Sequence, residues 1–389
     1  MKYMDEIDLK NKKVILRLDL NVPIKNDEIL DDTKILKSLP TIRYLINNNC
    51  KILLLSHLGK IKTEDDLKNN SLKSVGKKLS EELKKDITFI ENPIDPSIPN
   101  VLENNDLVLL ENTRFMDYPD KKESKCDMEL AKFWASAGDI FINDAFGTSH
   151  RKHASNYGIS KFLESAYGIL FKEELDGLMP LMNKNISKPF VVVMGGAKVD
   201  DKLNLINSLL EKCDYLLLGG GIANTFLKAD GFNIGSSLCN NEFLNEIKTL
   251  MDKNRNKIIY PTDVVVLSNG KPEKKEINDV LDEDIIYDIG SKTIDMYKEK
   301  IDDAKTIFIN GTVGLYEDDR FAKGTKDVLT YITDSKAIKI AGGGDSVSSI
   351  NRFGLNKSFD FLSTGGGATL EYIASGKIAC FEDELWYLY

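Results

Sequence analysis

Cationic, acidic and amide side chains gather at the ends of short apolar runs in the first half of the sequence. In "RLDLNVP", Arg17, Asp19 and Asn21 occupy alternate positions, so in extended backbone their side chains share one face. The motifs "LLLSHLGK", "LLENTRF" and "INDAFGTSHRKHAS" place further candidates after later runs: His57, Lys60, Arg114, His150, Arg151 and His153. Guanidinium groups bind carboxylates and phosphates through paired hydrogen bonds. Any one cluster could be a structural strand end, but all of them together predict a basin for a small, multiply anionic ligand.

Glycine dominates the second half, where three similar turns each join an apolar run to a helix-like pattern. They read "YLLLGGGIANTFL" (215–227), "IKIAGGGDSVSSI" (338–350) and "FLSTGGGATLEYI" (361–373). Backbone amides of such a turn can approach an anion, and the following helix directs its positive end to the same place. None matches the P-loop or the dinucleotide-binding fingerprint. One such turn could simply permit close helix packing, whereas three favour a bed for a polyphosphate.

Charged residues beside these turns support the same interpretation. Asp345 in "GGGDSV" stands where a helix N-cap belongs, and it is also placed to hold Mg²⁺ beside phosphate. Lys198 and Lys202 in "GGAKVDDKLNLI" are four residues apart, and so on one face if the segment is helical. Most lysines are solvated surface residues, but after a Gly-Gly turn at a strand end phosphate contact is the favoured interpretation.

Parallel sheets are the elements that would bring these residues together. Runs of Val, Ile and Leu alternate with helix-period segments, which is typical of parallel strands buried on both faces. The predicted strands are 14–18, 51–55, 107–111, 140–143, 190–194, 215–218, 257–260, 306–309, 337–341 and 359–362. A barrel of eight strand–helix units is an alternative, but about ten strands in this length favour two open sheets. Ligands then bind beyond the carboxyl ends of the strands.

Two domains are the expectation for a chain of 389 residues. Their best boundary is "LDGLMPLMNKNISKPF" (175–190), where a helix-like stretch containing Pro180 leads into a polar, proline-marked strand entry. Of the 27 glycines, 7 precede Lys188 and 20 follow it, whereas all three histidines lie before it. The first half therefore supplies imidazole and arginine, and the second supplies bare backbone.

Composition argues against several classes of function. A net charge of −9 argues against nucleic acid as the main partner, and no apolar run approaches the ~20 residues of a membrane span. The amino-terminal "MKYMDEIDLK" carries acids and no apolar region, so we expect no signal peptide. Five scattered cysteines without a C-x-x-C pair suit a reducing cytoplasm and predict neither a zinc site nor a disulfide framework.

Nine motifs, in order along the chain, resemble one family: phosphoglycerate kinase. They are "VILRLDLNVP", "SHLGK", "ENTRF", "DAFGTSHRKHAS", "GGAKVDDK", "GGGIANTFLK", "NGTVGLYE", "GGGDSV" and "STGGGATLE", and they cover nearly the whole chain. The resemblance implies an α/β fold of two Rossmann-like domains with parallel sheets. It implies a 3-phosphoglycerate-binding domain at 1–172 completed by a returning tail at 371–389, a connecting helix or hinge at 173–187, and a nucleotide-binding domain at 188–370.

The resemblance also implies a role for individual residues. For the acid substrate it implies Arg17, Asp19, Leu20, Asn21, Lys34, His57, Leu58, Gly59, Lys60, Arg114, His150, Arg151 and His153. For the nucleotide, with Asp345 also on the metal, it implies Gly195, Gly196, Lys198, Lys202, Gly219, Gly220, Gly290, Asn310, Glu317, Gly343, Gly344, Asp345 and Ser346. As catalytic residues facing the phosphoryl group in flight it implies Lys34, Lys198, Gly342, Gly365, Gly366 and Gly367.

The implied activity is reversible, Mg²⁺-dependent phosphoryl transfer between ATP and the carboxylate of 3-phosphoglycerate, giving ADP and 1,3-bisphosphoglycerate. The attacking carboxylate is already ionised at about pH 7. No general base is therefore needed, and the histidines are interpreted as anion ligands and orienters. With one substrate on each domain, we expect a hinge-bending, monomeric, cytoplasmic enzyme of glycolysis without a nucleic-acid or membrane partner.

Several positions depart from the family pattern. Arginine is replaced by Lys34 and by Lys60, proline by Thr312, and tryptophan by Ile309. The tail "SGKIACFEDELWYLY" lacks the usual glycine-lysine ending. Lysine keeps the charge but loses the planar fork, whereas complete loss of a transition-state arginine slows transfer ~10³–10⁵-fold. Two alternatives stay open: a weakened family member that binds ligands for regulation, and a kinase for another small carboxylate.

Overall fold

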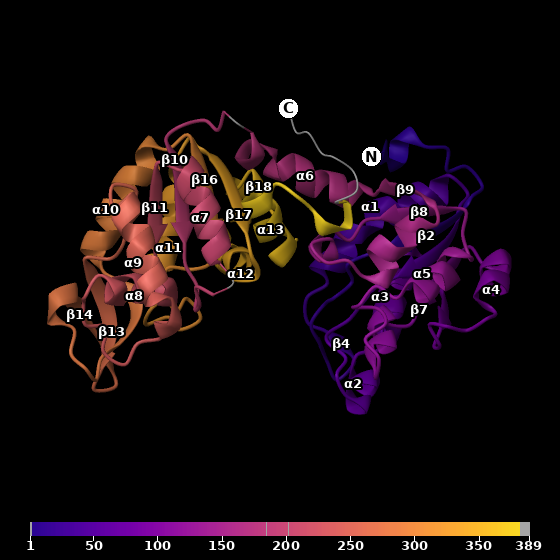
Figure 1. Ribbon diagram of the computed structural model, residues 1–389, viewed down its shortest axis with the longest axis horizontal. Helices are drawn as coiled ribbons and strands as arrows, with labels where there is room; N and C mark the ends of the chain where they lie inside the picture. The colour runs from indigo at the N-terminus through magenta and orange to yellow at the C-terminus, as the bar shows by residue number, and fades with distance from the viewer. Residues whose placement is uncertain (1, 184, 201, 382–389) are drawn as a thin grey trace. The chain divides into compact units, whose positions relative to one another are not determined.

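The computed structural model describes residues 2–183, 185–200 and 202–381. Its contacts divide the chain into two compact units, which can be followed by colour in Figure 1. The first unit runs to Asp176 and also contains the segment that begins at Lys377, and the second unit comprises 177–376. The part of the expected tail from 382 to 389 lies outside the described residues.

A seven-stranded parallel sheet forms the core of the first unit. Its order is β1 (Lys2–Tyr3), β9 (Glu164–Tyr167), β8 (Ile140–Asn143), β2 (Lys13–Arg17), β5 (Lys51–Leu55), β7 (Leu107–Leu110) and β6 (Thr88–Ile90). Alternate residues of β2 face opposite sides of the sheet, with Leu16 in one hydrophobic cluster and Ile15 in another. The central strands are apolar throughout because both sides are covered.

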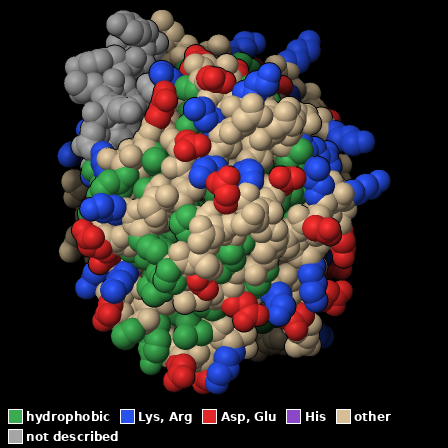
Figure 2. All heavy atoms as spheres, turned by 90° about the vertical axis from the view of Figure 1, so that its right-hand side faces the viewer, with side chains coloured by type: hydrophobic (Ala, Val, Ile, Leu, Met, Phe, Trp, Pro, Cys, Tyr) green, Lys and Arg blue, Asp and Glu red, His purple; other side chains and the backbone are tan. Residues whose placement is uncertain are grey.

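Helices cover both faces of this sheet. The helices are α1 (Thr33–Asn47), α2 (Glu64–Asn69), α3 (Lys73–Leu83), α4 (Ile98–Asn104) and α5 (Met128–Ala135). Buried residues of α1 and α3 share the cluster of Leu16, and those of α4 and α5 share the cluster of Ile15. A short hairpin pairs β3 (Ile24–Lys25) with β4 (Glu28–Ile29). On the face shown in Figure 2, basic and acidic side chains are interspersed.

A six-stranded parallel sheet forms the core of the second unit. Its order is β12 (Ile258–Ile259), β11 (Tyr215–Leu218), β10 (Phe190–Met194), β16 (Thr306–Asn310), β17 (Ile338–Gly342) and β18 (Phe361–Leu362). Its helices are α7 (Leu203–Lys212), α8 (Gly220–Ala229), α9 (Leu244–Asn254), α10 (Ser291–Asp303), α11 (Lys323–Asp334), α12 (Gly344–Arg352) and α13 (Gly367–Ser375). Two open parallel sheets confirm the predicted α/β architecture, and the barrel alternative is wrong.

The second unit also contains an antiparallel sheet that the apolar pattern did not predict. It comprises β14 (Lys271–Glu276), β13 (Asp263–Ser268) and β15 (Ile285–Ile289). Strand β14 escapes the pattern because its sequence, "KPEKKE", is almost entirely charged and mostly exposed. The signal that could have found this sheet is the pair Asn269 and Gly270, whose φ angles of 47° and 77° form the tight turn between β13 and β14.

The divisions between the units fall at two points of the chain. One lies within α6 (Ile169–Met182), between residues 176 and 177. The other follows residue 376, later than the start of the expected tail at 371, because α13 packs against α7. Ser208 Oγ and Lys212 Nζ donate to the carbonyl of Ile373 at 3.5 and 3.4 Å. Among the described residues, no helix combines the length and the apolar character needed to cross a bilayer.

Candidate active site

The carboxyl ends of four adjacent strands carry the cationic residues of the first unit. The sheet order β8-β2-β5-β7 places these ends along one edge. Arg17 ends β2, His57 follows β5, Arg114 follows β7, and residues 150–153 follow β8. Clusters that are far apart in the sequence therefore meet at one edge. We call Arg17, His57, Arg114 and 150–153 the cationic cluster, after the charge of its arginines and its lysine.

Arg17 is completely buried, with an exposed fraction of 0%. Its Nε donates to Ser155 Oγ at 2.8 Å, and its Nη1 donates to Leu18 O at 2.5 Å. Its Nη2 lies 3.4 Å from Nδ1 of His57. The guanidinium is thus held by protein groups on three of its nitrogens, and the direct ligand contact that the sequence suggested for Arg17 stays a prediction.

A second network joins the remaining polar residues of this edge. Lys34 Nζ donates to Asp19 Oδ2 at 2.8 Å, so the charge of Lys34 is held beside the cluster. Asn21 Oδ1 accepts from Gly59 N at 2.9 Å, and Arg114 Nη1 donates to Gly59 O at 2.9 Å. The buried Nε of Arg114 has no hydrogen-bond partner among the described residues.

Two buried polar side chains fix the loops that carry these groups. The hydroxyl of Ser56 accepts from Leu20 N at 2.9 Å. The side chain of Asn112 accepts from Leu58 N at 3.1 Å and donates to Leu58 O at 2.7 Å. Leu20 and Leu58 themselves have buried side chains, so they act by placing backbone. Both supporting residues were missed as candidates, although each stands inside one of the nine motifs.

The histidines of this unit are neutral at about pH 7. Burial, reinforced by the charges of Arg17 and Arg114, holds the pKa of His57 well below 6.5. Burial and nearby arginines likewise lower the pKa of His150 to about 4 and that of His153 to about 3. Neutral imidazoles can donate one hydrogen bond each to an anion without adding charge. Lys60 and Arg151 are exposed and supply further positive charge.

In the second unit, the turn after β10 is joined by hydrogen bonds to the turn after β16. The amides of Gly195 and Gly196 donate to the carbonyls of Asn310 and Thr312, at 2.9 and 3.0 Å. A side chain at Gly195 would collide with the backbone of Thr312, and Gly196 has a φ of +108° that favours glycine. These glycines permit close approach of two turns, and their amides are already occupied.

The turn after β11 is built in the same way. The amides of Gly219 and Gly220 donate to the carbonyls of Met194 and Val313, both at 2.9 Å. A side chain at Gly219 would collide with Val313. For this triple-glycine turn, therefore, close packing is the observed reason for the first two glycines. Their N–H groups are already used within the protein.

The other two triple-glycine turns have open helix starts. Gly343 (φ +92°) precedes α12, and Gly366 (φ +54°) precedes α13. Neither helix has a side-chain cap bond in the described part of the chain, so first-turn amides such as those of Gly344 and Gly367 are available donors. Gly365 N donates to the hydroxyl of Ser363 at 3.2 Å, which fixes the approach to α13. These two helix starts carry N–H groups of the kind expected at a phosphate site, and phosphate binding there stays a prediction.

Buried side chains lock the end of β17 beneath the start of α12. The amide nitrogen of Asn310 donates to Gly342 O at 2.7 Å, and Ser346 Oγ donates to the same carbonyl at 2.9 Å. The hydroxyl of Ser346 also accepts from Gly311 N at 2.6 Å. The last residue of β17 is thus held by two predicted site residues at once.

Two local predictions about this unit are wrong. Asp345 is not the N-cap of α12 but its second residue, because the positive φ of Gly343 starts the helix earlier. Lys198 and Lys202 do not share a helical face, because Lys202 is the N-cap of α7 and Lys198 lies in the loop before it. Lys202 Nζ donates to Gly195 O at 2.7 Å, whereas Lys198 and Asp345 are exposed.

Gly290 and Glu317 lie on other elements of the second unit. Gly290 is the N-cap of α10 and is buried against Asp263, whose carboxylate accepts from Lys292 N and Thr293 N at 3.0 and 2.8 Å. A side chain at Gly290 would collide with that carboxylate. Glu317 is exposed. Their assignment to adenine and ribose stays a prediction.

Comparison with known proteins identifies the family. A family model described as phosphoglycerate kinase matches residues 4–377. The chain belongs to the phosphoglycerate kinase family. A phosphoglycerate kinase of Mesomycoplasma hyopneumoniae is 45% identical over 390 residues, covering 97% of this chain and 96% of that protein. One of Fusobacterium nucleatum is 43% identical and covers 97% of both chains.

Solved structures of phosphoglycerate kinases agree with the observed architecture. The structure from Coxiella burnetii has a TM-score of 0.83 at 36% identity and covers 97% of both chains. The structure from Pyrococcus horikoshii has a TM-score of 0.86 at 30% identity and covers 98% of both chains. The resemblance drawn from nine motifs and the expected pair of Rossmann-like sheets are thereby confirmed.

Proposed function

We propose that this chain transfers a phosphoryl group between ATP and the carboxylate of 3-phosphoglycerate, in both directions, as an enzyme of glycolysis. The proposal is supported by the presence of a different candidate anion site in each unit. One is the cationic cluster of the first unit, and the other is the pair of open helix starts of the second. A small phosphorylated acid suits the first, and a polyphosphate suits the second.

The chemistry needs positioning and charge stabilisation more than proton transfer. The acid's carboxylate is ionised, and the neutral histidines would bind and orient it as hydrogen-bond donors. In the transition state, charge spreads over the oxygens of the moving phosphoryl group. Lys198, Lys34 and the amides at the start of α13 are the groups we assign to that charge. Transfer also requires a conformational step that brings the two bound substrates within reach and excludes water.

The residues at the start of α12 fit a magnesium ion that is shared with the nucleotide. No group of three or more candidate metal-binding side chains occurs in the described parts of the chain. Magnesium, however, is commonly held by one or two carboxylates together with substrate phosphates and water. Asp345 is an exposed carboxylate beside free amides, so it would hold the ion. The ion would supply neutralisation of phosphate charge.

We further propose that the enzyme acts as a cytoplasmic monomer without nucleic-acid or membrane partners. Its five cysteines are all free, which suits a reducing compartment. The net charge of −9 disfavours polyanionic partners. Sedimentation at micromolar concentration would test the monomer directly.

A coupled spectrophotometric assay tests the activity. Turnover of ATP is expected only when 3-phosphoglycerate is present, and D-glycerate, which lacks the phosphate, should support little. Lys34→Arg should change kcat less than about tenfold, because Lys34 already places a positive charge beside Asp19. The regulatory alternative receives no support from relatives that match over the whole chain. Binding of both ligands in calorimetry without turnover would overturn our proposal in its favour.

A further inference from the structure

Beneath the cationic cluster, two buried residues that the sequence did not single out continue the hydrogen bonds of Arg17. Glu123 and Ser155 both have exposed fractions of 0%. Glu123 accepts from Ser155 N at 2.9 Å and from the hydroxyl of Ser155. That hydroxyl oxygen accepts from Arg17 Nε, and Arg17 Nη2 reaches Nδ1 of His57. The four residues form one hydrogen-bonded chain of side chains that ends at His57, which we assign to the 3-phosphoglycerate site.

The chemistry of these groups gives the chain one direction of polarity. A guanidinium group only donates hydrogen bonds, so His57 Nδ1 must accept and the neutral ring must carry its proton on Nε2. By the same reasoning, the oxygen of Ser155 accepts from Arg17 and its hydroxyl proton goes to Glu123. Arg17 thus donates at both ends, to His57 Nδ1 and to Ser155.

We propose that Glu123 is a positioning residue for the acid substrate: through Ser155 it orients Arg17, and Arg17 fixes His57 as the tautomer that donates from Nε2. This inference rests on the proposed function. His57 is the right target for such control because it is neutral, enclosed among Arg17, Arg114, Lys34 and His153, and only 6% exposed. A ring protonated on Nδ1 would instead have a bare Nε2, and the lone pair of that acceptor would repel an anionic oxygen.

A purely structural role for Glu123 makes different predictions. Its backbone carbonyl separately accepts from Ala154 N at 3.0 Å, so the loop stays attached when the carboxylate is changed. In Glu123→Gln, either the amide NH₂ faces the amide of Ser155 or it faces the hydroxyl. In the first case the hydrogen bond from Ser155 N is lost, and in the second the amide donates to Ser155 Oγ and reverses the direction of that hydrogen bond, while shape is kept in both. Ser155→Ala instead keeps both charges and removes only the bridging hydroxyl.

The tautomer can be read directly by long-range ¹H–¹⁵N NMR on the full chain with labelled histidine. His150→Gln and His153→Gln assign the three sets of ring signals. At about pH 7 wild-type His57 is expected to show a bare Nδ1 and a protonated Nε2, whereas Ser155→Ala should give a mixture of tautomers. A protonated Nδ1 in the wild type overturns the proposal without reference to activity or to any variant. Failure of the proposed function alone would leave this spectrum unchanged.

Steady-state kinetics then separate positioning from general damage. Glu123→Gln and Ser155→Ala should each raise KM for 3-phosphoglycerate about tenfold, with KM for ATP unchanged. The control is Glu103→Gln, an exposed carboxylate that pairs with Lys13 in the same unit, which should change neither constant. Unaltered His57 spectra and an unaltered KM in both variants would overturn the proposal, as would equal changes in the KM of both substrates.

Discussion

We propose that the two units bind anions by opposite means. In the first, side chains such as Arg114 and His57 carry the site, and the backbone serves to hold them, as Gly59 does between Asn21 and Arg114. In the second, open backbone amides at α12 and α13 carry the site, and side chains such as Ser346 serve to hold backbone. A side-chain site is lost by truncation, whereas a backbone site is lost by adding a Cβ atom.

Lys198 is the exception that tests this contrast most strongly, because it is an exposed side chain in the backbone-built unit. We expect Lys198→Ala to lower kcat by about 10²–10³-fold, since a cation aimed at the moving phosphoryl group stabilises charge that develops only in the transition state. Calorimetry should show unchanged binding of 3-phosphoglycerate to the first unit. The measurement that decides is kcat from steady-state assays.

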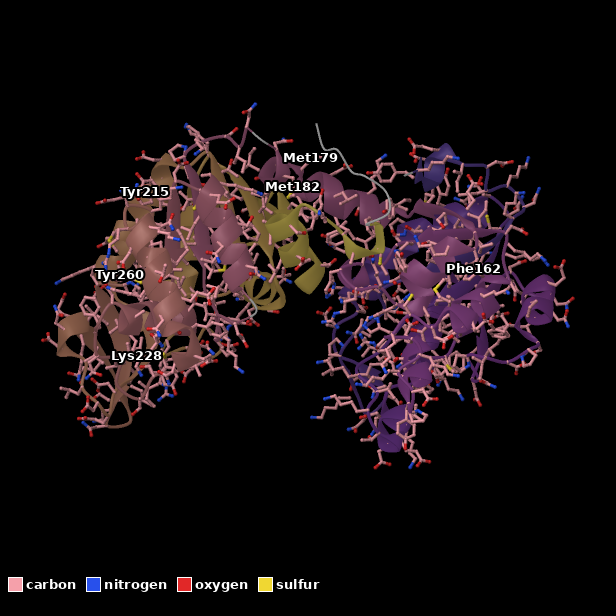
Figure 3. The ribbon with its side chains drawn as sticks, viewed as in Figure 1. Phe162, Met179, Met182, Tyr215, Lys228 and Tyr260 are labelled. Atoms are coloured by element: carbon pink, nitrogen blue, oxygen red, sulfur yellow. The ribbon has the colours of Figure 1, made fainter. Side chains whose placement is uncertain are left out.

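The matched control for this change is Lys228→Ala. Lys228 is also an exposed lysine of the second unit, on α8, and it is labelled in Figure 3. Its loss should leave kcat unchanged, because solitary surface lysines contribute little. A normal kcat in Lys198→Ala, or equal losses in the two variants, would contradict the role assigned to Lys198.

Acid should affect the two units with opposite sign. In the first unit, the pKa values of His57, His150 and His153 are lowered, to about 4 and about 3 in the last two. Between pH ~6.5 and ~4.5 these histidines bind protons in the unfolded chain but stay neutral in the folded one, so stability falls as pH falls. In the second unit, burial raises the pKa of Asp288 to about 7. Its folded carboxyl binds a proton that the unfolded one does not, so stability rises as pH falls.

The size of the acid effect follows from opposing groups in the first unit. Burial raises the pKa of Asp144 to about 7 and also raises that of Glu123, and both oppose the histidines. The unfolded first unit then binds at most about two more protons than the folded one. Lowering the pH from about 7 to about 5 should therefore lower its free energy of unfolding by about 1–3 kcal/mol. Hydrogen exchange read by mass spectrometry, corrected for intrinsic rates, follows each unit separately. Parallel loss of protection in both units would contradict the prediction.

The strands were predictable because burial leaves a direct trace in sequence. Every predicted run overlaps an observed strand of a parallel sheet, whereas the short strands β1, β6 and β9 were missed; β9, "ESAY", has a partly polar and exposed sequence. The cationic residues were predictable as a group, since residue type alone shows their charge and a parallel sheet brings the carboxyl ends of its strands to one edge. The enclosure of Arg17 was not, because it depends on Ser155 and His57, which meet it only in three dimensions.

Backbone sites are harder to predict, because the same Gly-Gly-Gly sequence can serve either close packing or anion binding. The first two amides of "GGG" after β11 donate within the protein, while "GGG" before α12 leaves a helix start open. What differs is the neighbour: Gly219 and Gly220 lie against the turn after β16, and Gly344 has open space around it. Nothing in a triplet of glycines encodes that neighbour, so sequence could place the site without saying which amides bind.

Adding one methyl group at Gly343 tests the backbone site with the smallest expected effect. Gly343 has a φ of +92°, and a Cβ there would lie 2.6 Å from Nδ2 of Asn310, which holds the end of β17. Gly343→Ala should therefore tilt the first amides of α12 and weaken nucleotide affinity about tenfold, while the affinity for 3-phosphoglycerate stays the same. The measurement is calorimetric titration of each ligand.

Gly354→Ala is the matched control, since Gly354 has a φ of +70° and a Cβ added there would meet nothing within 4 Å. Both variants put a side chain at a positive φ, and the variant at Gly343 should lose more thermal stability because its Cβ also meets Asn310; only that variant should lose nucleotide in calorimetry. If the two lose nucleotide affinity equally, the strain itself and not the direction of the amides governs binding. The claim that the second unit binds its anion through backbone amides would then be wrong.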